Sequence, residues 1–185
     1  MGDEKMTWLQ RNYPDAKGLI IIPRQLKGGF LIGGSRGSGV LVVRNPETGQ
    51  WSQPGFYTVS SLSLGPQIGG QAAGVMMIVR TERALTRLFR SSVKLGGDTS
   101  VALGPVGVGV RSAVTADIVT FARSRGAYVG VSLEGSMIRV RSGWNESYFG
   151  RPVRPVDIFV KENVRNPGAD KLIRTISETE LKVQR

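Results

Sequence analysis

The chain has 185 residues, a length that suits a single domain with one hydrophobic core. Its 25 Lys and Arg against 14 Asp and Glu give a formal charge of +11. A positive field of this size favours nucleic acid, anionic lipid or acidic protein partners, with solubility alone as the alternative reason for the charge. Because the chain has no cysteine and no histidine, disulfides, Ser-His-Asp or Cys-His catalysis and Cys/His zinc sites are excluded.

Hydrophobic segments are short throughout the chain. The longest, Leu19–Ile22 and Val75–Val79, are strand-sized, whereas a membrane-spanning helix needs at least ~18 apolar residues. The polar start Met1–Lys5 is followed by no signal-peptide core. We therefore expect a soluble or peripheral protein, cytoplasmic unless a leader has been removed, in which case the bacterial periplasm or cell envelope is expected.

The sequence of the N-terminal half predicts a short helix followed by glycine-rich strands. Met6, Leu9 and Tyr13 have helical spacing and predict a helix over residues 5–14. The run 33–39 is rich in glycine, but it lacks the Gly-Lys-Ser/Thr ending of a phosphate loop and precedes a strand-like segment, so a turn-forming glycine cluster explains it better. Where glycines alternate with apolar residues, they indicate bulges, bends or close backbone approach within strands. Residues 45–49 predict a hairpin connection.

A helix is predicted over residues 81–90. Thr81 suits its N-cap, and the apolar positions fall on one stripe while arginines fall on the opposite one. The apolar residues are Ala84, Leu85, Leu88 and Phe89, and the basic residues are Arg80, Arg83, Arg87 and Arg90. This pattern indicates an anion-facing helix or, equally, an ordinary surface helix packed on the core.

The C-terminal half combines strands with a second helix. The apolar frame shifts between residues 103 and 106, which predicts a bulge or turn at Gly104-Pro105. Period-2 alternation over 128–134 and 138–141 predicts strands. Arg123 with Arg125, and Arg139 with Arg141, are pairs that a strand presents on one face. A helix is expected from about Pro167, capped by Asn166, with Leu172, Ile173 and Ile176 inward.

Catalytic chemistry has little support in the sequence. The carboxylates are scattered, and capping or solvated roles fit them better than paired acid–base roles; they include Asp98, Asp117, Glu134, Glu146 and Asp157. No metal or cofactor is expected. The aromatic residues lie in apolar or turn contexts, whereas single-strand recognition needs them exposed among basic residues, so nucleic acid ranks below lipid.

An ordered series of motifs resembles a known family. The series is Ala16–Pro23, Lys27–Phe30, Gly33–Leu41, Trp51–Pro54, Gly65–Gly69, Gly104–Gly107, Ser124–Tyr128, Gly130–Ser136 and Trp144–Gly150. In this order and spacing, over about 16–160, it resembles the SYLF domain family, found in bacterial envelope proteins and in eukaryotic actin-patch and phosphoinositide-binding proteins. The ending through Arg151-Pro152-Val153 resembles the bacterial branch.

The resemblance implies phospholipid binding, in eukaryotic members to phosphoinositides through basic residues and an N-terminal amphipathic segment, and in some members actin binding. The sequence departs from the family pattern in two places. Its N-terminal segment is short and acidic, and Gly70-Gln71-Ala72-Ala73 stands where an acidic residue is frequent in the family. Roles that depend on that acidic group are not carried over.

Together these observations predict one domain over 1–185 with an α+β, β-dominant fold: a curved antiparallel sheet or partial barrel, a few covering helices and a C-terminal helical tail over 167–185. The predicted function is non-enzymatic binding of anionic phospholipid, phosphoinositide-like or with another acidic headgroup, at a membrane surface. The alternatives are a nucleic-acid-binding protein, a structural or actin-type scaffold, and an unrecognised hydrolase. The predicted lipid-binding residues are Lys27, Arg83, Arg87, Arg90, Arg123, Arg125, Arg139 and Arg141.

Overall fold

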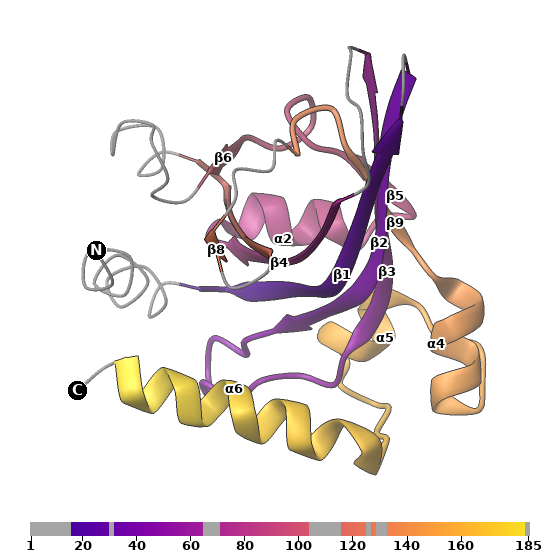
Figure 1. Cartoon of the computed structure of the whole chain (residues 1–185). Helices are drawn as coiled ribbons and strands as arrows, with labels where there is room; N and C mark the ends of the chain where they lie inside the picture. Colours follow the sequence, from indigo (N-terminus) through magenta and orange to yellow (C-terminus); the bar gives the residue numbers. More distant parts are fainter. Residues whose placement is uncertain are drawn as a thin grey trace.

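The fold is dominated by one strongly curved sheet (Figure 1). The computed structural model describes residues 16–29, 32–64, 71–103, 116–124, 127–128 and 133–183. Within them nine strands form a single sheet of order β5-β9-β3-β2-β1-β4-β7-β6, with β8 paired to β7. Neighbouring strands are antiparallel except β6 and β7. The predicted β-dominant curved sheet with a few helices is confirmed.

The strands are β1 (Gly18–Gly29), β2 (Ile32–Val43), β3 (Gly55–Leu64), β4 (Gln71–Val79), β5 (Ser92–Lys94), β6 (Val101–Leu103), β7 (Ile118–Ser124), β8 (Ala127–Tyr128) and β9 (Met137–Val140). The helices are α2 (Glu82–Leu88), α4 (Ser142–Phe149), α5 (Pro155–Phe159), the 3-10 turn η1 (Pro167–Ala169) and α6 (Asp170–Val183). The helix predicted over 5–14 and the turn predicted at Gly104-Pro105 lie outside the described residues.

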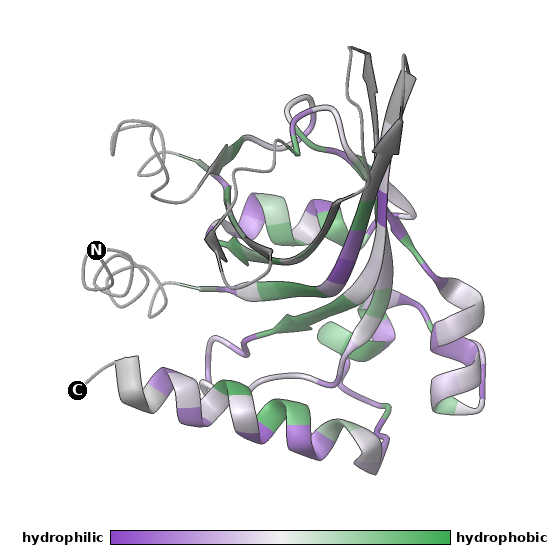
Figure 2. Cartoon of the chain, in the orientation of Figure 1, coloured by the Kyte–Doolittle hydropathy of each residue, from purple (hydrophilic) through white to green (hydrophobic). Residues whose placement is uncertain are grey.

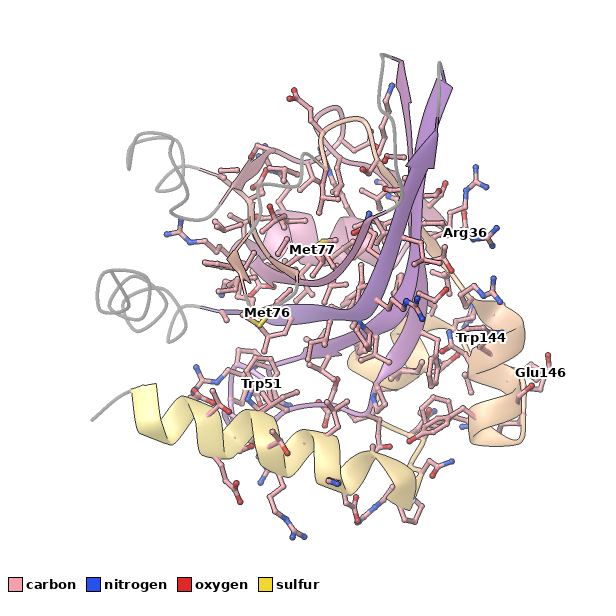
Figure 3. The ribbon with its side chains drawn as sticks, viewed as in Figure 1. Arg36, Trp51, Met76, Met77, Trp144 and Glu146 are labelled. Carbon is pink, nitrogen blue, oxygen red and sulfur yellow. The ribbon has the colours of Figure 1, made fainter. Side chains whose placement is uncertain are left out.

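Two hydrophobic clusters lie on opposite faces of the sheet. The larger one fills the concave side, where Leu85 and Leu88 of α2 pack against strand residues such as Ile20 and Met77. The smaller one lies on the outer side, where Ile176 of α6 packs against Leu19 and its strand neighbours. The side chains of adjacent residues in one strand therefore point to opposite faces of the sheet, as Met76 and Met77 illustrate (Figure 3).

A bulge in β1 changes which residues face outward. Ile21 is opposite Val40 but Arg24 is opposite Ser38, so β1 carries one extra residue at this point. Pro23 lies inside the bulge, where its missing N–H removes no ladder hydrogen bond. Odd-numbered residues of β1 therefore face outward before the bulge and even-numbered residues after it.

Two glycines of β2 accommodate the same bulge. A Cβ on Gly39 would overlap the carbonyl oxygen of Ile21, and a Cβ on Gly37 would lie 2.6 Å from Cγ2 of Ile22. The backbone of β1 approaches β2 too closely for any side chain here. The close approach expected of strand glycines is confirmed at these two positions. The prediction that the run 33–39 forms turns is wrong, because these residues lie within β2.

The start of α2 is as predicted, but its end is earlier. The Thr81 side chain accepts a hydrogen bond from the Ala84 N–H at 3.2 Å and caps the helix, and Leu85 and Leu88 are buried. The helix ends at Leu88 with Phe89 as its C-cap, so Arg90 lies in the turn that leads into β5. The prediction that the helix reaches Arg90 is wrong, because the chain must turn there to enter the sheet.

The helix after Pro167 is present. Asn166 caps η1 by accepting from the Gly168 N–H at 2.8 Å, and α6 follows directly. Hydrophobic and hydrophilic residues alternate along α6, as expected for a helix that packs on one side only (Figure 2). Glu180 is buried and accepts from the Trp51 indole N–H at 3.1 Å, which attaches the second half of α6 to the sheet.

The predicted hairpin connection at Asn45–Gly49 is also present. The N–H of Asn45 donates to the carbonyl of Gln50 at 2.8 Å, and that of Gly49 donates to Asn45 at 2.9 Å. Gly49 has φ of 70°, a left-handed conformation that favours glycine. The turn therefore joins β2 to the segment that carries Trp51.

Candidate functional site: the basic outer face of the sheet

Charge is distributed very unevenly over the sheet. None of the 14 acidic residues lies in a strand that the structure describes, whereas these strands carry several arginines and lysines. On the outer side of β1, β2, β9 and β5, four exposed cations follow one another: Arg24, Arg36, Arg139 and Lys94. We call these four residues, with the hydroxyl residues Ser38, Thr58 and Ser60 between them, the basic face.

The strand register places the basic face on the outer side. Arg24 is opposite Ser38, which is opposite Thr58, which is opposite Arg139. One step further along, Arg36 is opposite Ser60, Ser60 is opposite Met137, and Met137 is opposite Lys94. Directly opposed residues of paired strands share a face, so the two rows lie side by side.

Strand β3 separates the cations into two pairs. Neighbouring strands lie about 4.8 Å apart, and Arg36 and Arg139 are two strand spacings apart across the sheet and two residues apart along it. Their backbones are therefore roughly 12 Å from each other. The residues of β3 between them are small, and the Thr58 hydroxyl hydrogen-bonds that of Ser38 at 3.0 Å. Thr58 is buried, whereas Ser38 and Ser60 are partly exposed. The guanidinium groups and these two serine hydroxyls supply hydrogen-bond donors suited to phosphate or carboxylate oxygens.

No counter-ion neutralises the basic face from within the described part of the chain. The ion pairs there involve Lys17, Arg44, Arg83, Arg154, Lys161 and Arg165, and no residue of the basic face. Arginine is charged at every physiological pH. The face is therefore a fixed positive surface that is open to an external anion.

The outer side of the sheet is not basic along its whole length. Toward the other end of the strands the same face carries Leu19, Ile21 and Val42, and α6 packs over that apolar part. The bulge at Pro23 marks the change on β1, since Ile21 precedes it and Arg24 follows it. The basic face is thus the part of the outer surface that begins where the packed apolar part ends.

Apolar groups border the basic face at two ends. Leu26, directly opposite Arg36, is 51% exposed. At the other end α4 stands out from the sheet, and its Trp144 packs edge-on against Phe56 of β3 with ring centroids 6.1 Å apart. The guanidinium of Arg141 lies over the Trp144 ring, 4.2 Å from its centroid. Figure 3 shows Arg36 and Trp144 on the same outer side of the molecule.

The residues predicted from the sequence do not form one patch. Arg139 belongs to the basic face and Arg141 lies at its border, whereas Arg83 and Arg87 belong to α2 on the concave side. Arg90 is exposed in the turn before β5. The side chains of Lys27 in β1 and Arg123 in β7 lie outside the described part, as does the whole of Arg125.

Arg83 has an internal partner. Its guanidinium donates to Oδ2 of the buried Asp117 at 2.8 Å. Burial alone would raise the pKa of Asp117, but hydrogen bonds from Ser100, Thr81 and Arg83 outweigh it and lower the pKa to about 2. This carboxylate joins the start of α2 to the segments before β6 and β7. Arg83 therefore stabilises the folded structure through its ion pair with Asp117.

Several residues of the motifs that resemble the SYLF family make contacts that stabilise the fold. Trp51 binds Glu180 of α6, and the Ser52 hydroxyl accepts from the Val43 N–H at 3.0 Å. Asn145 is fully buried, and its Oδ1 accepts from the Phe56 N–H at 2.7 Å, which fixes α4 to β3. Gly150 ends α4 with φ of 71°.

A pocket of about 450 Å³ lies where β9, α5 and the turn after α2 meet. Its floor is apolar, with Phe89 and Val153 among the lining residues. Its two cations, Arg154 and Lys161, both pair with Asp157. Backbone and side-chain hydrogen bonds lower the pKa of Asp157, which keeps this helix-capping carboxylate ionised.

The described residues contain no group of three or more carboxylates that could hold a metal ion. Among the helices placed by the structure, none is both long and apolar enough to cross a bilayer.

Comparison with known proteins places these features in a family context. Residues 60–179 match the Ysc84 family, described as "Las17-binding protein actin regulator". The chain is 35% identical over 164 residues to the human SH3 domain-containing YSC84-like protein 1, covering 85% of this chain and 47% of that protein. It is 33% identical over 168 residues to Protein YSC84 of Saccharomyces cerevisiae, covering 87% of this chain and 36% of that protein.

The Xenopus laevis SH3 domain-containing YSC84-like protein 1 is 33% identical over 187 residues, covering 91% of this chain and 55% of that protein. The chain therefore spans about half the length, 47%, of the first curated relatives it matches. No solved structure matches it significantly.

Proposed function

Since this chain belongs to the Ysc84 family, the family of the SYLF domain, we propose that its basic face binds anionic phospholipid at a membrane surface. The proposed headgroup is acidic, a phosphoinositide or another anionic phospholipid. The protein would thereby associate peripherally with a membrane. No enzymatic step is included in the proposal.

The observation that carries the proposal is the basic face itself. Arg24, Arg36, Arg139 and Lys94 are exposed on one side of one sheet without an ion-pair partner among the described residues. An isolated structural arginine on a strand is ordinary, but an acid-free run of cations across neighbouring strands presents a continuous positive field. A membrane with anionic lipids presents the complementary surface.

Electrostatic attraction would supply most of the affinity. Each Lys or Arg held near an anionic surface contributes about 1 kcal/mol, and the contribution falls off within a Debye length of about 8 Å at physiological salt. The sheet fixes the spacing of the backbones that carry the cations, and the long side chains can adjust to the headgroups. The affinity should therefore follow lipid charge and ionic strength more closely than lipid chain length.

Co-sedimentation with vesicles tests the proposal. The protein should sediment with vesicles of phosphatidylserine or phosphatidylinositol phosphates in phosphatidylcholine and stay in solution with phosphatidylcholine alone, and raising salt should release it. Equal binding to neutral vesicles, or binding that salt does not change, would contradict the electrostatic account.

The arginines predicted on α2 define a competing surface. Arg87 and Arg90 have no ion pair among the described residues, and the pair carries the same charge as Arg36 and Arg139. Comparing the two pairs therefore separates a general loss of charge from loss of the basic face. Arg83 is unsuitable for this comparison because it binds Asp117.

A second candidate function follows from the family description, which names actin regulation. The basic face would then meet an acidic surface of an actin filament in place of a membrane. Filament co-sedimentation with the same variants distinguishes the two. Loss of filament binding in the basic-face variant, with vesicle binding absent in the parent, would favour the actin function.

A further inference from the structure

Trp144 differs from the other described tryptophan, Trp51. Trp51 is only 6% exposed and donates its indole N–H to Glu180. Trp144 is 46% exposed, and no described residue accepts a hydrogen bond from its indole N–H. A half-exposed indole combines an apolar ring with an N–H donor, so it suits an interface that is apolar on one side and polar on the other.

The position of Trp144 connects it to the basic face. The large hydrophobic residues most exposed in the described structure are Leu26, Trp144, Val156 and Val160. Leu26 and Trp144 border the basic face, while Val156 and Val160 belong to the segment of α5, whose buried residues join the concave cluster. An exposed aromatic therefore lies next to unpaired cations on one side of the molecule (Figure 3).

We infer that Trp144, with Arg141 stacked on it, is an interfacial anchor that enters the headgroup region when the basic face binds a membrane. The inference rests on the proposed function and adds an orientation to it: the domain would lie with its basic face and the adjoining flank of α4 against the lipid. Trp144 would contribute apolar burial, and the cations would contribute electrostatic attraction.

The ring is held in place by buried contacts. Asn145, the next residue, is fully buried and fixes the start of α4 to β3 through the Phe56 N–H. Phe56 also packs edge-on against the Trp144 ring. It packs against Tyr148 as well, with ring centroids 5.1 Å apart. Little conformational entropy would therefore be lost when lipid covers the ring.

The chemistry of the Arg141–Trp144 pair suits a membrane interface. Indole rings concentrate at the headgroup level because they combine an apolar body with an N–H donor. A guanidinium over the ring face brings a cation to the depth of the phosphates and gains from the cation–π attraction. Glu146, the acidic residue of α4, lies on the side of the helix that points away from the sheet (Figure 3).

Tryptophan fluorescence tests the inference directly. A W8F background leaves Trp51 and Trp144, and subtracting the signal of W8F/W144F isolates Trp144 from the buried Trp51. The vesicles contain phosphatidylserine with phosphatidylcholine that is brominated near the glycerol end of its chains. We expect a blue shift and strong quenching of the Trp144 emission on binding, and neither change with vesicles of phosphatidylcholine alone.

An affinity measurement supplies the second readout. W144A should bind the anionic vesicles about tenfold more weakly, the change expected when about half of an aromatic side chain's burial energy is lost. V160S, which removes a more exposed apolar residue at the C-cap of α5, should bind as the parent does. Circular dichroism establishes that both variants are folded.

The outcomes separate this inference from the proposed function. If the parent does not sediment with anionic vesicles, the proposed function fails, and the inference fails with it. If the parent sediments while the Trp144 emission is neither shifted nor quenched, lipid binding stands and the anchor is overturned. Equal losses in W144A and V160S would also overturn it.

Discussion

Arg36 and Arg139 lie on the same outer face of the sheet, on either side of β3, with Thr58 and Ser60 between them. They come from strands that are far apart in the chain, and the register of β2, β3 and β9 brings them together. Neither has an ion pair among the residues that the structure describes. This relationship is the basis of the proposed membrane contact.

The buried carboxylate of Asp117 makes stability depend on pH. Its folded-state pKa of about 2 lies below the ordinary value of 3.8, so the ionised form is favoured by folding. The resulting stabilisation, about 2 kcal/mol, is complete above pH ~4 and is lost as pH falls toward 2. D117N should lower the free energy of unfolding by about that amount at neutral pH. Urea titrations of both proteins at several pH values should show the difference shrinking in acid, and a constant difference would contradict this role.

Gly39 should not tolerate a side chain. Because a Cβ there would overlap the carbonyl oxygen of Ile21, G39A must displace backbone at the β1 bulge. We expect a loss of about 3 kcal/mol in unfolding free energy. G143A is the control: a Cβ at Gly143 meets no atom within 4 Å, and alanine in a helix is favoured by up to about 1 kcal/mol. Thermal denaturation that ranks the two variants in the opposite order would refute the bulge geometry.

Glu180 should hold α6 on the sheet. Its carboxylate accepts from the Trp51 indole and pairs with Arg44 at 2.7 Å. E180A leaves both partners without this acceptor, which should cost about 3 kcal/mol and speed amide exchange along α6. E178A removes an exposed carboxylate of the same helix and should change stability by less than about 0.5 kcal/mol. Hydrogen exchange in α6 that is equal in the two variants would contradict this attachment.

Local patterns in the sequence predicted the elements with strong local signals. Thr81 and the apolar stripe after it predicted the start of α2. Asn166 before Pro167 predicted a helix that the structure shows as η1 followed by α6. The alternation of Ile138 and Arg139 predicted an inner and an outer face, and Ile138 is indeed buried. Capping and alternation depend on neighbours within a few residues, which is why they can be read from sequence.

The site was less accessible to sequence analysis, because it depends on register between distant strands. Arg24 faces the same way as Arg36 only through the bulge at Pro23, which reverses the alternation of β1. Lys94 lies in a strand of three residues, too short for a periodic signal. Helical spacing placed Arg83 outward but gave no sign that Asp117, 34 residues later, would bind it. One usable signal was the absence of acidic residues from residues 18–43 and 55–79.

The most direct test compares two charge-matched variants in vesicle co-sedimentation. R36Q/R139Q removes two cations of the basic face and should bind phosphatidylserine vesicles about 30-fold more weakly, since each cation contributes about 1 kcal/mol. Its melting temperature should stay close to that of the parent, because both side chains are exposed. R87Q/R90Q removes the same charge from the α2 region and should bind nearly as the parent does. Parent-like binding by R36Q/R139Q, or an equal loss in R87Q/R90Q, would contradict the assignment of the basic face as the membrane-binding surface.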